Sequence, residues 1–305
     1  MTNTVTTYNL SKSYGKTKAI EDISFEVGQA ELFGLIGPDG AGKTTIFRIL
    51  TSLILADEGE AKLNGIDVAK DYKKIRQIIG YMPGRFSLYQ DLTVEENLNF
   101  FATVFGTTID ENYDLIKDIY HQIEPFKKRR AGKLSGGMKQ KLALSCALIH
   151  KPEILILDEP TTGVDAVSRK EFWDMLKNLK AKGITILVST PYMDEASLCD
   201  RVALIQKGKI MQIDTPQNIV NSFEKELISL KADNIYGLLK DLRKHPEMHS
   251  VFPFGQTLHY TNVSGKINIE ELNSYLTQNK HKNIEIEPIK ANIEDCFMSK
   301  MVTGN

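Results

Sequence analysis

The sequence is short of cysteine, of long apolar runs and of net charge, and each shortage excludes a class of protein. Its three cysteines, Cys146, Cys199 and Cys296, lie far apart and lack the spacing of a metal site. We therefore expect reduced thiols in a cytoplasmic protein. Lysine and arginine together number 38 against 39 acidic residues. This balance predicts no nucleic-acid partner, because broad electrostatic binding of nucleic acid needs a basic face.

No stretch reaches the roughly 18 apolar residues that a membrane-spanning helix requires. The first ten residues, MTNTVTTYNL, lack the basic-then-apolar order of a signal peptide. We therefore expect any membrane role to depend on another chain. The chain has 305 residues, of which 42% are apolar, and this length is enough for one large domain and a small one.

Hydrophobic periodicity predicts an α/β fold for most of the chain. Residues 1 to about 30 alternate polar and apolar side chains, which indicates an antiparallel sheet with one wet face. Buried strands are predicted in ELFGLIG, EILILDEP and ITILVST, the last of them stopping at Ser189-Thr190-Pro191. Helices are predicted over residues 93–123, 135–150 and 168–180. Strands that alternate with helices favour a mixed or parallel sheet with helices on both faces.

The pattern changes after Pro216. From ELISLKA to NIEDCFMSKM the predicted order of elements is β-α-β-β-α-β-α, which suggests a small α+β domain of the ferredoxin-like kind over residues 226–305. No chemical motif appears in it. We place the boundary between the two domains near residues 214–226.

A glycine-rich turn, GPDGAGKTT, connects a predicted strand to a predicted helix and fits the phosphate-loop pattern G-x-x-x-x-G-K-[ST]. Glycines let backbone N–H groups surround a phosphate at a helix N-terminus. In this loop Lys43 is expected to reach the β- and γ-phosphates, and the Thr44 hydroxyl to bind Mg²⁺. The predicted nucleotide-binding residues of the loop are Gly37, Pro38, Asp39, Gly40, Ala41, Gly42, Lys43, Thr44 and Thr45.

A second buried strand ends in the acidic pair Asp158 and Glu159, within ILILDE. Ligands bind at the carboxyl ends of parallel strands in open α/β sheets. Asp158 is therefore a candidate metal ligand, and Glu159 is a candidate catalytic base for the water that attacks the γ-phosphate. Acidic residues commonly end strands, so this pair alone is a weak indication of a site. Together with the phosphate loop it becomes a strong one.

The stretch LSGGMKQ opens another helix with Ser135, Gly136 and Gly137. These residues provide a second helix N-terminus that can bind an anion. A simple capped helix is the plainer interpretation. Two phosphate-binding helix ends in one chain suggest that they meet across a dimer.

The order of SYGKTKAI, GPDGAGKTT, LSGGMKQ, ILILDEPTTGVD and LVSTPYMDEA closely resembles the nucleotide-binding subunit of an ATP-binding cassette transporter, over residues 1 to about 220. The residues of the stretches YMPGRFSLYQDLTVEENL and STPYMDEA resemble those of the ABC-2 type exporter branch. The resemblance implies a P-loop NTPase cassette with an antiparallel N-terminal subsheet and a helical subdomain at about residues 85–150. It also implies a cassette dimer that holds ATP and Mg²⁺, bound to ABC-2 type membrane permease subunits on the inner face of the cell membrane.

The same resemblance assigns roles to two further residues. Tyr14 would stack on adenine, and Asp165 would lie in the loop that crosses the dimer interface. The segment 85–91 is our candidate contact with the permease, and an ordinary exposed loop is the alternative.

Two positions depart from the family pattern. Gly84 stands where the family usually has glutamine, and Pro191 stands where it usually has the histidine that contacts the γ-phosphate. Losing one preorganised group from a transition state costs about 10²–10³ in rate. The residues that bind nucleotide are all present. We therefore expect intact ATP binding with hydrolysis that is slowed or dependent on a partner.

Several functions are compatible with these motifs. The leading one is the ATPase subunit of an ABC-2 exporter. The alternative is a nucleotide-binding regulatory cassette, with little ATPase activity of its own, in an asymmetric heterodimer. A soluble cassette acting on ribosomes or DNA would usually show tandem cassettes or basic arms, which are not visible here. A P-loop kinase does not explain LSGGMKQ.

Overall fold

The computed structural model describes residues 3–303, which form two compact units divided between Thr215 and Pro216. Among the described residues, no helix is both long and apolar enough to cross a membrane.

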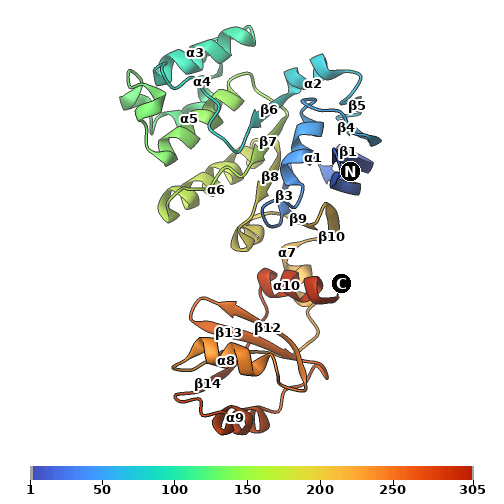
Figure 1. The fold of residues 1–305 in the computed structure, drawn as a ribbon. Helices are drawn as coiled ribbons and strands as arrows, with labels where there is room; N and C mark the ends of the chain where they lie inside the picture. The colour runs from blue at the N-terminus through green and yellow to red at the C-terminus, as the bar shows by residue number, and fades with distance from the viewer. Residues whose placement is uncertain (1–2, 304–305) are drawn as a thin grey trace. The chain divides into compact units, whose positions relative to one another are not determined.

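The first unit is built on a six-stranded sheet with the order β10-β9-β3-β8-β7-β6 (Figure 1). Five strands run parallel, and β10 is antiparallel to its neighbour β9. The central strands β3, β7 and β8 are buried along their whole length, which confirms the predicted α/β class. The strands are β3 (Leu32–Ile36), β6 (Ile79–Met82), β7 (Ile154–Asp158), β8 (Thr185–Thr190), β9 (Arg201–Gln206) and β10 (Lys209–Asp214).

A separate antiparallel sheet has the order β2-β1-β4-β5. Its strands are β1 (Asn3–Tyr14), β2 (Thr17–Gly28), β4 (Glu58–Leu63) and β5 (Ile66–Asp67). Helix α1 (Lys43–Leu50) shares one hydrophobic core with both sheets, since Phe47 packs in the same cluster as Ile23 of β2 and Ile156 of β7. The helix that follows the phosphate loop is therefore held between two sheets.

Three helices form the helical subdomain: α3 (Val94–Val104), α4 (Ile109–Tyr120) and α5 (Gly136–Leu148). The predicted helical region 93–123 is divided at Gly106, whose φ of +69° suits glycine. Thr93 and Thr108 begin α3 and α4 with complete capping boxes, so each start is specified locally. Short 3₁₀ turns occupy Glu124–Phe126, Ala131–Lys133 and Met193–Leu198.

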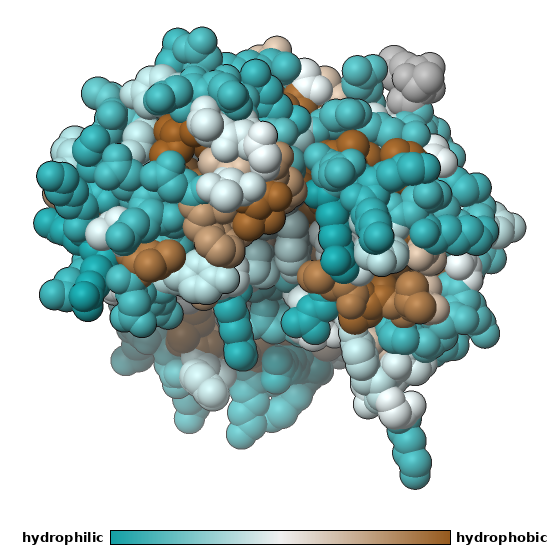
Figure 2. Space-filling view, turned by 90° about the horizontal axis from the view of Figure 1, so that it is seen from above, coloured by the Kyte–Doolittle hydropathy of each residue, from teal (hydrophilic) through white to brown (hydrophobic). Residues whose placement is uncertain are grey.

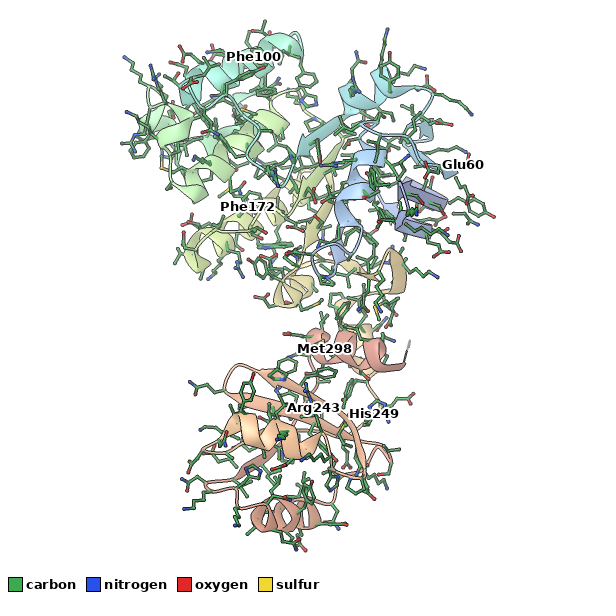
Figure 3. All side chains as sticks on the ribbon, in the orientation of Figure 1. Glu60, Phe100, Phe172, Arg243, His249 and Met298 are labelled. Atoms are coloured by element: carbon green, nitrogen blue, oxygen red, sulfur yellow. The ribbon has the colours of Figure 1, made fainter. Side chains whose placement is uncertain are left out.

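Two more helices complete this unit. Helix α2 (Tyr72–Ile78) precedes β6, and α6 (Ala166–Ala181) packs on β3 and β8. Phe172 lies on α6 (Figure 3) and is buried with its neighbour Trp173. Asp165 caps α6 by accepting hydrogen bonds from the amides of Val167 and Ser168, so the helix begins two residues earlier than the hydrophobic pattern predicts.

The second unit begins with α7 (Pro216–Asn221) and then has the predicted order β-α-β-β-α-β-α. Its elements are β11 (Leu227–Lys231), α8 (Ile235–Leu242), β12 (Met248–Phe254), β13 (Thr257–Asn262), α9 (Ile269–Gln278), β14 (Glu285–Ile289) and α10 (Ile293–Thr303). The strands pair antiparallel in the order β12-β13-β11-β14. This is a ferredoxin-like arrangement, with Leu230 and Tyr260 of the sheet packed in one core with Leu238 of α8 and Leu272 of α9.

Candidate functional site

The phosphate loop leaves the end of β3 and is clamped on two sides before α1 begins. A Cβ at Gly42 would lie 2.6 Å from Ile20 Cγ2 and 2.7 Å from the Ala19 carbonyl of β2. The turn between β9 and β10 holds the other side, because Gly208 N donates to the Ala41 carbonyl at 3.1 Å. Gly42 also has a φ of +106°, which strongly favours glycine. The loop is therefore shaped by strand β2 and by the β9–β10 turn.

Lys43 is the first residue of α1 and only 3% of it is exposed. Its Nζ donates to the Gly37 carbonyl at 2.7 Å and to the Pro38 carbonyl at 3.0 Å. It also lies 3.1 Å from Glu159 Oε1. The structure thus brings together the lysine and the acidic residue that the sequence placed in one site.

Asp158 ends β7 directly beside β8, and 3% of it is exposed. Its Oδ1 accepts a hydrogen bond from Ser189 Oγ at 2.7 Å. Within residues 3–303 the structure shows no ion pair for this carboxylate and no hydrogen bond to Oδ2. A buried carboxylate with a free oxygen fits a hard cation such as Mg²⁺, with Thr44, in the first turn of α1, as the other predicted ligand.

The negative charge of Asp158 also affects its surroundings. Burial raises the pKa of Tyr81 on β6 to about 12, and the nearby Asp158 carboxylate contributes to the rise. Tyr81 is therefore a neutral phenol across the physiological pH range.

Glu159 follows β7 with a φ of +50°, a left-handed conformation that is costly for a residue other than glycine. Its amide donates to the carbonyl of Ser189 at 3.1 Å and to the Ser189 hydroxyl at 3.0 Å. Its side chain turns to Lys43. Sequence reasoning missed Ser189, which contacts both acidic residues. The sequence did contain a signal for it: two hydroxyl residues, Ser189 and Thr190, end a buried strand. In the structure that strand pairs with the one that ends in Asp158.

Both departures from the family pattern lie at this edge of the sheet. A Cβ at Gly84 would lie 3.1 Å from the Asp158 carbonyl and 3.8 Å from Asp158 Oδ2. Pro191 comes directly after β8, whose last residue, Thr190, accepts a hydrogen bond from the amide of Gly37 at 3.3 Å. The two substitutions therefore border the phosphate loop and the acidic pair.

The residues after Pro191 are committed to other contacts. The ring of Tyr192 faces the Arg169 guanidinium, whose Cζ lies 4.3 Å from the ring centroid. The buried carboxylate of Glu195 accepts hydrogen bonds from Thr161 and Thr190. Tyr192 thus contacts α6, and nothing in its placement replaces the expected imidazole.

The second predicted anion site is built as expected locally. Ser135 caps α5 by accepting a hydrogen bond from Met138 N at 3.4 Å. A Cβ at Gly137 would lie 2.8 Å from Ser168 Oγ, and one at Gly136 would lie 3.5 Å from the Gly163 carbonyl. The glycines therefore approach the loop and first turn of α6, not the phosphate loop of the same chain.

Two other predicted residues lie on exposed turns. Tyr14 ends β1 and is 46% exposed, in the hairpin that leads into β2. Asp165 begins α6, and hydrogen bonds from the amides that it caps lower the pKa of its carboxyl.

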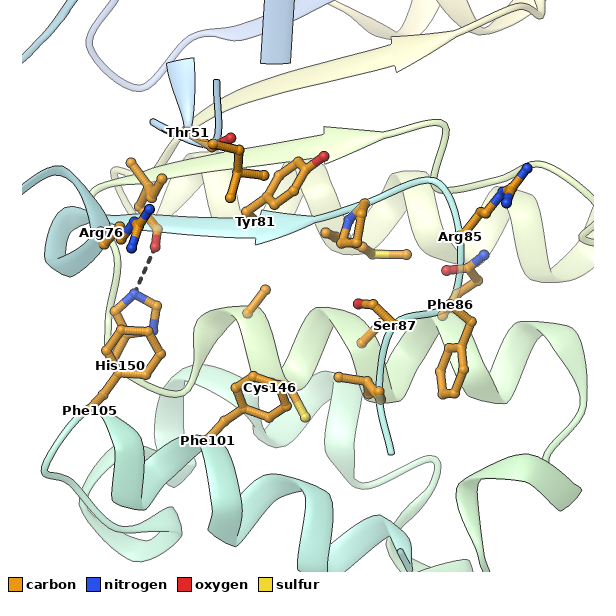
Figure 4. Close-up of a pocket in the computed structure, with 18 residues that line it drawn as sticks. Thr51, Arg76, Tyr81, Arg85, Phe86, Ser87, Phe101, Phe105, Cys146 and His150 are labelled. Carbon is orange, nitrogen blue, oxygen red and sulfur yellow. Dashed lines mark hydrogen bonds between the residues drawn. The ribbon is translucent and has the colours of Figure 1, made fainter. Parts of the chain in front are cut away.

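A hollow of about 360 Å³ lies between β6 and the helical subdomain (Figure 4). Its walls are mostly apolar and include Phe101 of α3 and Phe105, which follows that helix. The His150 ring stacks on Phe105 at a centroid distance of 3.8 Å. His150 Nε2 lies 2.9 Å from the Ile79 carbonyl. Figure 2 shows patches of apolar surface among hydrophilic side chains on the face above these elements.

The charges around this hollow have one sign. Arg76 and Arg85 line it, and no carboxylate does among the described residues. Arg85 is exposed and makes no ion pair within residues 3–303. Four residues of the segment 85–91 line the hollow, namely Arg85, Phe86, Ser87 and Leu88.

A family model described as ABC transporter matches residues 20–162. The chain is 40% identical over 213 residues to the probable multidrug ABC transporter ATP-binding protein YbhF of Escherichia coli, an alignment that covers 69% of this chain but 37% of YbhF. It is 36% identical to the linearmycin resistance ATP-binding protein LnrL of Bacillus subtilis, across 69% of each chain. It is 38% identical to the Nod factor export ATP-binding protein I of Burkholderia lata, across 70% of this chain and 71% of that one.

Solved structures give the same result. An ATP-binding subunit of an ABC transporter superposes with a TM-score of 0.66 at 29% identity, covering 72% of this chain and 92% of that one. The dimeric bacterial cassette MJ0796 superposes with a TM-score of 0.63 at 25% identity, covering 69% and 98%. MJ0796 has also been solved in a post-hydrolysis state bound to ADP and phosphate, again as a dimer.

The clamp on the phosphate loop predicts unequal effects of two glycine substitutions. Gly42→Ala forces a Cβ against Ile20 and Ala19, which combines overpacking of about 1–3 kcal/mol with left-handed strain of about 1–2 kcal/mol. Gly40→Ala is the matched control, because Gly40 has a φ of +76° and open space at its Cβ. Urea unfolding should show the larger loss of stability for Gly42→Ala. Equal losses would contradict the clamp.

Proposed function

Because this chain belongs to the ATP-binding protein family of ABC transporters, we propose that it binds and hydrolyses ATP to drive a membrane exporter of the ABC-2 type. The observation that carries the proposal is the meeting of Lys43 with Glu159 and of Ser189 with Asp158, at the carboxyl edge of one parallel sheet. Two of the relatives are named for multidrug transport and Nod factor export, which supports export as the direction. Neither name specifies the substrate of this chain.

ATP binding is proposed at the phosphate loop, with Gly37 to Thr45 around the phosphates and Tyr14 on adenine. Lys43 Nζ lies 3.1 Å from Glu159, so a bound γ-phosphate competes with Glu159 for the lysine. Transfer of Lys43 to the phosphate frees the Glu159 carboxylate. The ion pair thus links nucleotide binding to the release of the base.

Hydrolysis is proposed to use Glu159 as the general base. Its carboxylate accepts a proton from water as the water oxygen bonds to the γ-phosphorus and the bond to the β–γ bridging oxygen breaks. Asp158 and Thr44 would hold Mg²⁺, which neutralises charge on the phosphate oxygens when bound. The products are ADP and phosphate.

The signature residues Ser135, Gly136 and Gly137 are proposed to complete the site of a second cassette. In this chain they approach Gly163 and Ser168, next to the Asp165 loop, so these features form one surface. A dimer of cassettes would place that surface on the partner's nucleotide, and MJ0796 is one related cassette that has been solved as a dimer. Whether the second cassette is identical or different, the presence of Glu159 favours an active ATPase over a purely regulatory chain.

The hollow beside β6 is proposed as the contact with the permease. It combines an aromatic lining with a basic rim, and it includes residues of the predicted segment 85–91. Through this contact the chain would be held on the inner face of the membrane.

Removing the base tests the proposed reaction. We expect Glu159→Gln to bind ATP but to release phosphate about 10²–10⁴-fold more slowly, because the amide cannot accept the proton. Equilibrium dialysis with ATP and a single-turnover phosphate assay measure the two properties separately. Glu171→Gln is the control, since Glu171 pairs with Lys141 on the helices, away from the phosphate loop. Hydrolysis by Glu159→Gln at the parent rate would refute this role.

Charge reversal tests the proposed membrane contact. We expect Arg85→Glu to recover less of an integral membrane protein than the parent chain does, because the hollow would lose half of its arginine charge. The measurement is affinity capture with tagged protein from detergent-solubilised membranes of the source cells, followed by mass spectrometry. Lys128→Glu, an exposed reversal outside the hollow, should leave recovery unchanged. Equal recovery with both variants would rule out this surface.

A further inference from the structure

Ser189 contacts both acidic residues of the site, the side chain of Asp158 and the amide of Glu159, although no role was assigned to it from the sequence. It lies on β8 with 0% of its surface exposed. Parallel pairing sets it opposite Asp158 on one side and opposite Leu35 of β3 on the other. Ser189 therefore occupies the central strand between the phosphate loop and the acidic pair.

The hydroxyl of Ser189 makes two hydrogen bonds of opposite direction. An ionised carboxylate can only accept, so Ser189 Oγ donates its proton to Asp158 Oδ1 at 2.7 Å. The same oxygen accepts from the amide of Glu159 at 3.0 Å. A hydroxyl is the small group that can donate and accept at once, so alanine at this position would lose both bonds.

The first bond decides which oxygen of Asp158 stays available. With Oδ1 engaged by Ser189, Oδ2 is the oxygen that has no hydrogen bond among residues 3–303, and it lies on the side of Gly84. The second bond acts on the backbone of Glu159, which is left-handed at a φ of +50°. Such a conformation persists only where its surroundings hold it.

We infer that Ser189 is a positioning residue, which turns Asp158 Oδ2 toward Mg²⁺ and fixes the backbone from which Glu159 projects. The inference rests on the proposed function, and it adds a residue to it. Groups that orient a metal ligand typically change metal affinity or activity about 10–100-fold when they are removed.

The test is the gain in nucleotide affinity that Mg²⁺ provides. The probe is a fluorescent ADP analogue, titrated at saturating Mg²⁺ and again in EDTA, and the gain is the ratio of the two dissociation constants. We expect Ser189→Ala to reduce this gain by about tenfold or more, with little change in EDTA. Ser189→Thr keeps the hydroxyl and should restore the gain.

Ser145→Ala is the matched control. Ser145 is equally buried, and its hydroxyl donates to the Lys141 carbonyl within α5. Its loss should lower stability without changing the Mg²⁺ gain. Hydrogen exchange without nucleotide gives a second readout. The Glu159 amide keeps its bond to the Ser189 carbonyl in Ser189→Ala and loses only the bond to the hydroxyl, so it should exchange modestly faster than in the parent.

The outcomes separate the two proposals. If the parent chain shows no affinity for the nucleotide at either condition, the proposed function fails and this role fails with it. If the parent shows the gain and Ser189→Ala keeps it, the role of Ser189 is refuted while the proposed function stands. A gain that Ser189→Thr does not restore would also refute a role for the hydroxyl.

Discussion

The parallel register of β3, β8 and β7 is the constraint on which the site depends. Leu35 pairs with Ser189, and Ser189 pairs with Asp158, so three strands end level at one edge of the sheet. The phosphate loop, Thr190 and the acidic pair therefore meet although they are far apart in sequence. Shifting one strand by a residue would turn its side chains to the opposite face and separate Asp158 from Ser189.

Much of the fold could be predicted, because local signals specify it. The strand–loop–helix order around GPDGAGKTT, the antiparallel pairing of β1 with β2 and the element order of the second unit are confirmed. The predicted alternation holds for β2 but not for β1, where Tyr8 is exposed. Long-range contacts could not be predicted. Ala19 of β2 and Gly208 of the β9–β10 turn clamp the phosphate loop, and the role of Ser189 depends on strand register.

The site combines a complete set of phosphate-binding residues with two missing side chains. Lys43 and Glu159 form an ion pair; under the proposed function a γ-phosphate replaces Glu159 at the lysine, which couples nucleotide binding to release of the base. Gly84 places its backbone close to Asp158, and Pro191 offers no side-chain donor. In the proposed reaction the chain supplies the phosphate-binding residues and the base, and it lacks the glutamine and histidine side chains that would help to stabilise the transition state.

Restoring the two missing side chains tests whether their absence slows hydrolysis. The steady-state rate of phosphate release by the purified chain should be measured beside that of a variant carrying Gly84→Gln and Pro191→His together, with ATP affinity determined for both. We expect similar ATP affinities for the two proteins. The variant should release phosphate at least about 10²-fold faster, because one preorganised group typically contributes about 10²–10³ in rate. A parent chain that hydrolyses ATP as fast as the double variant would contradict it.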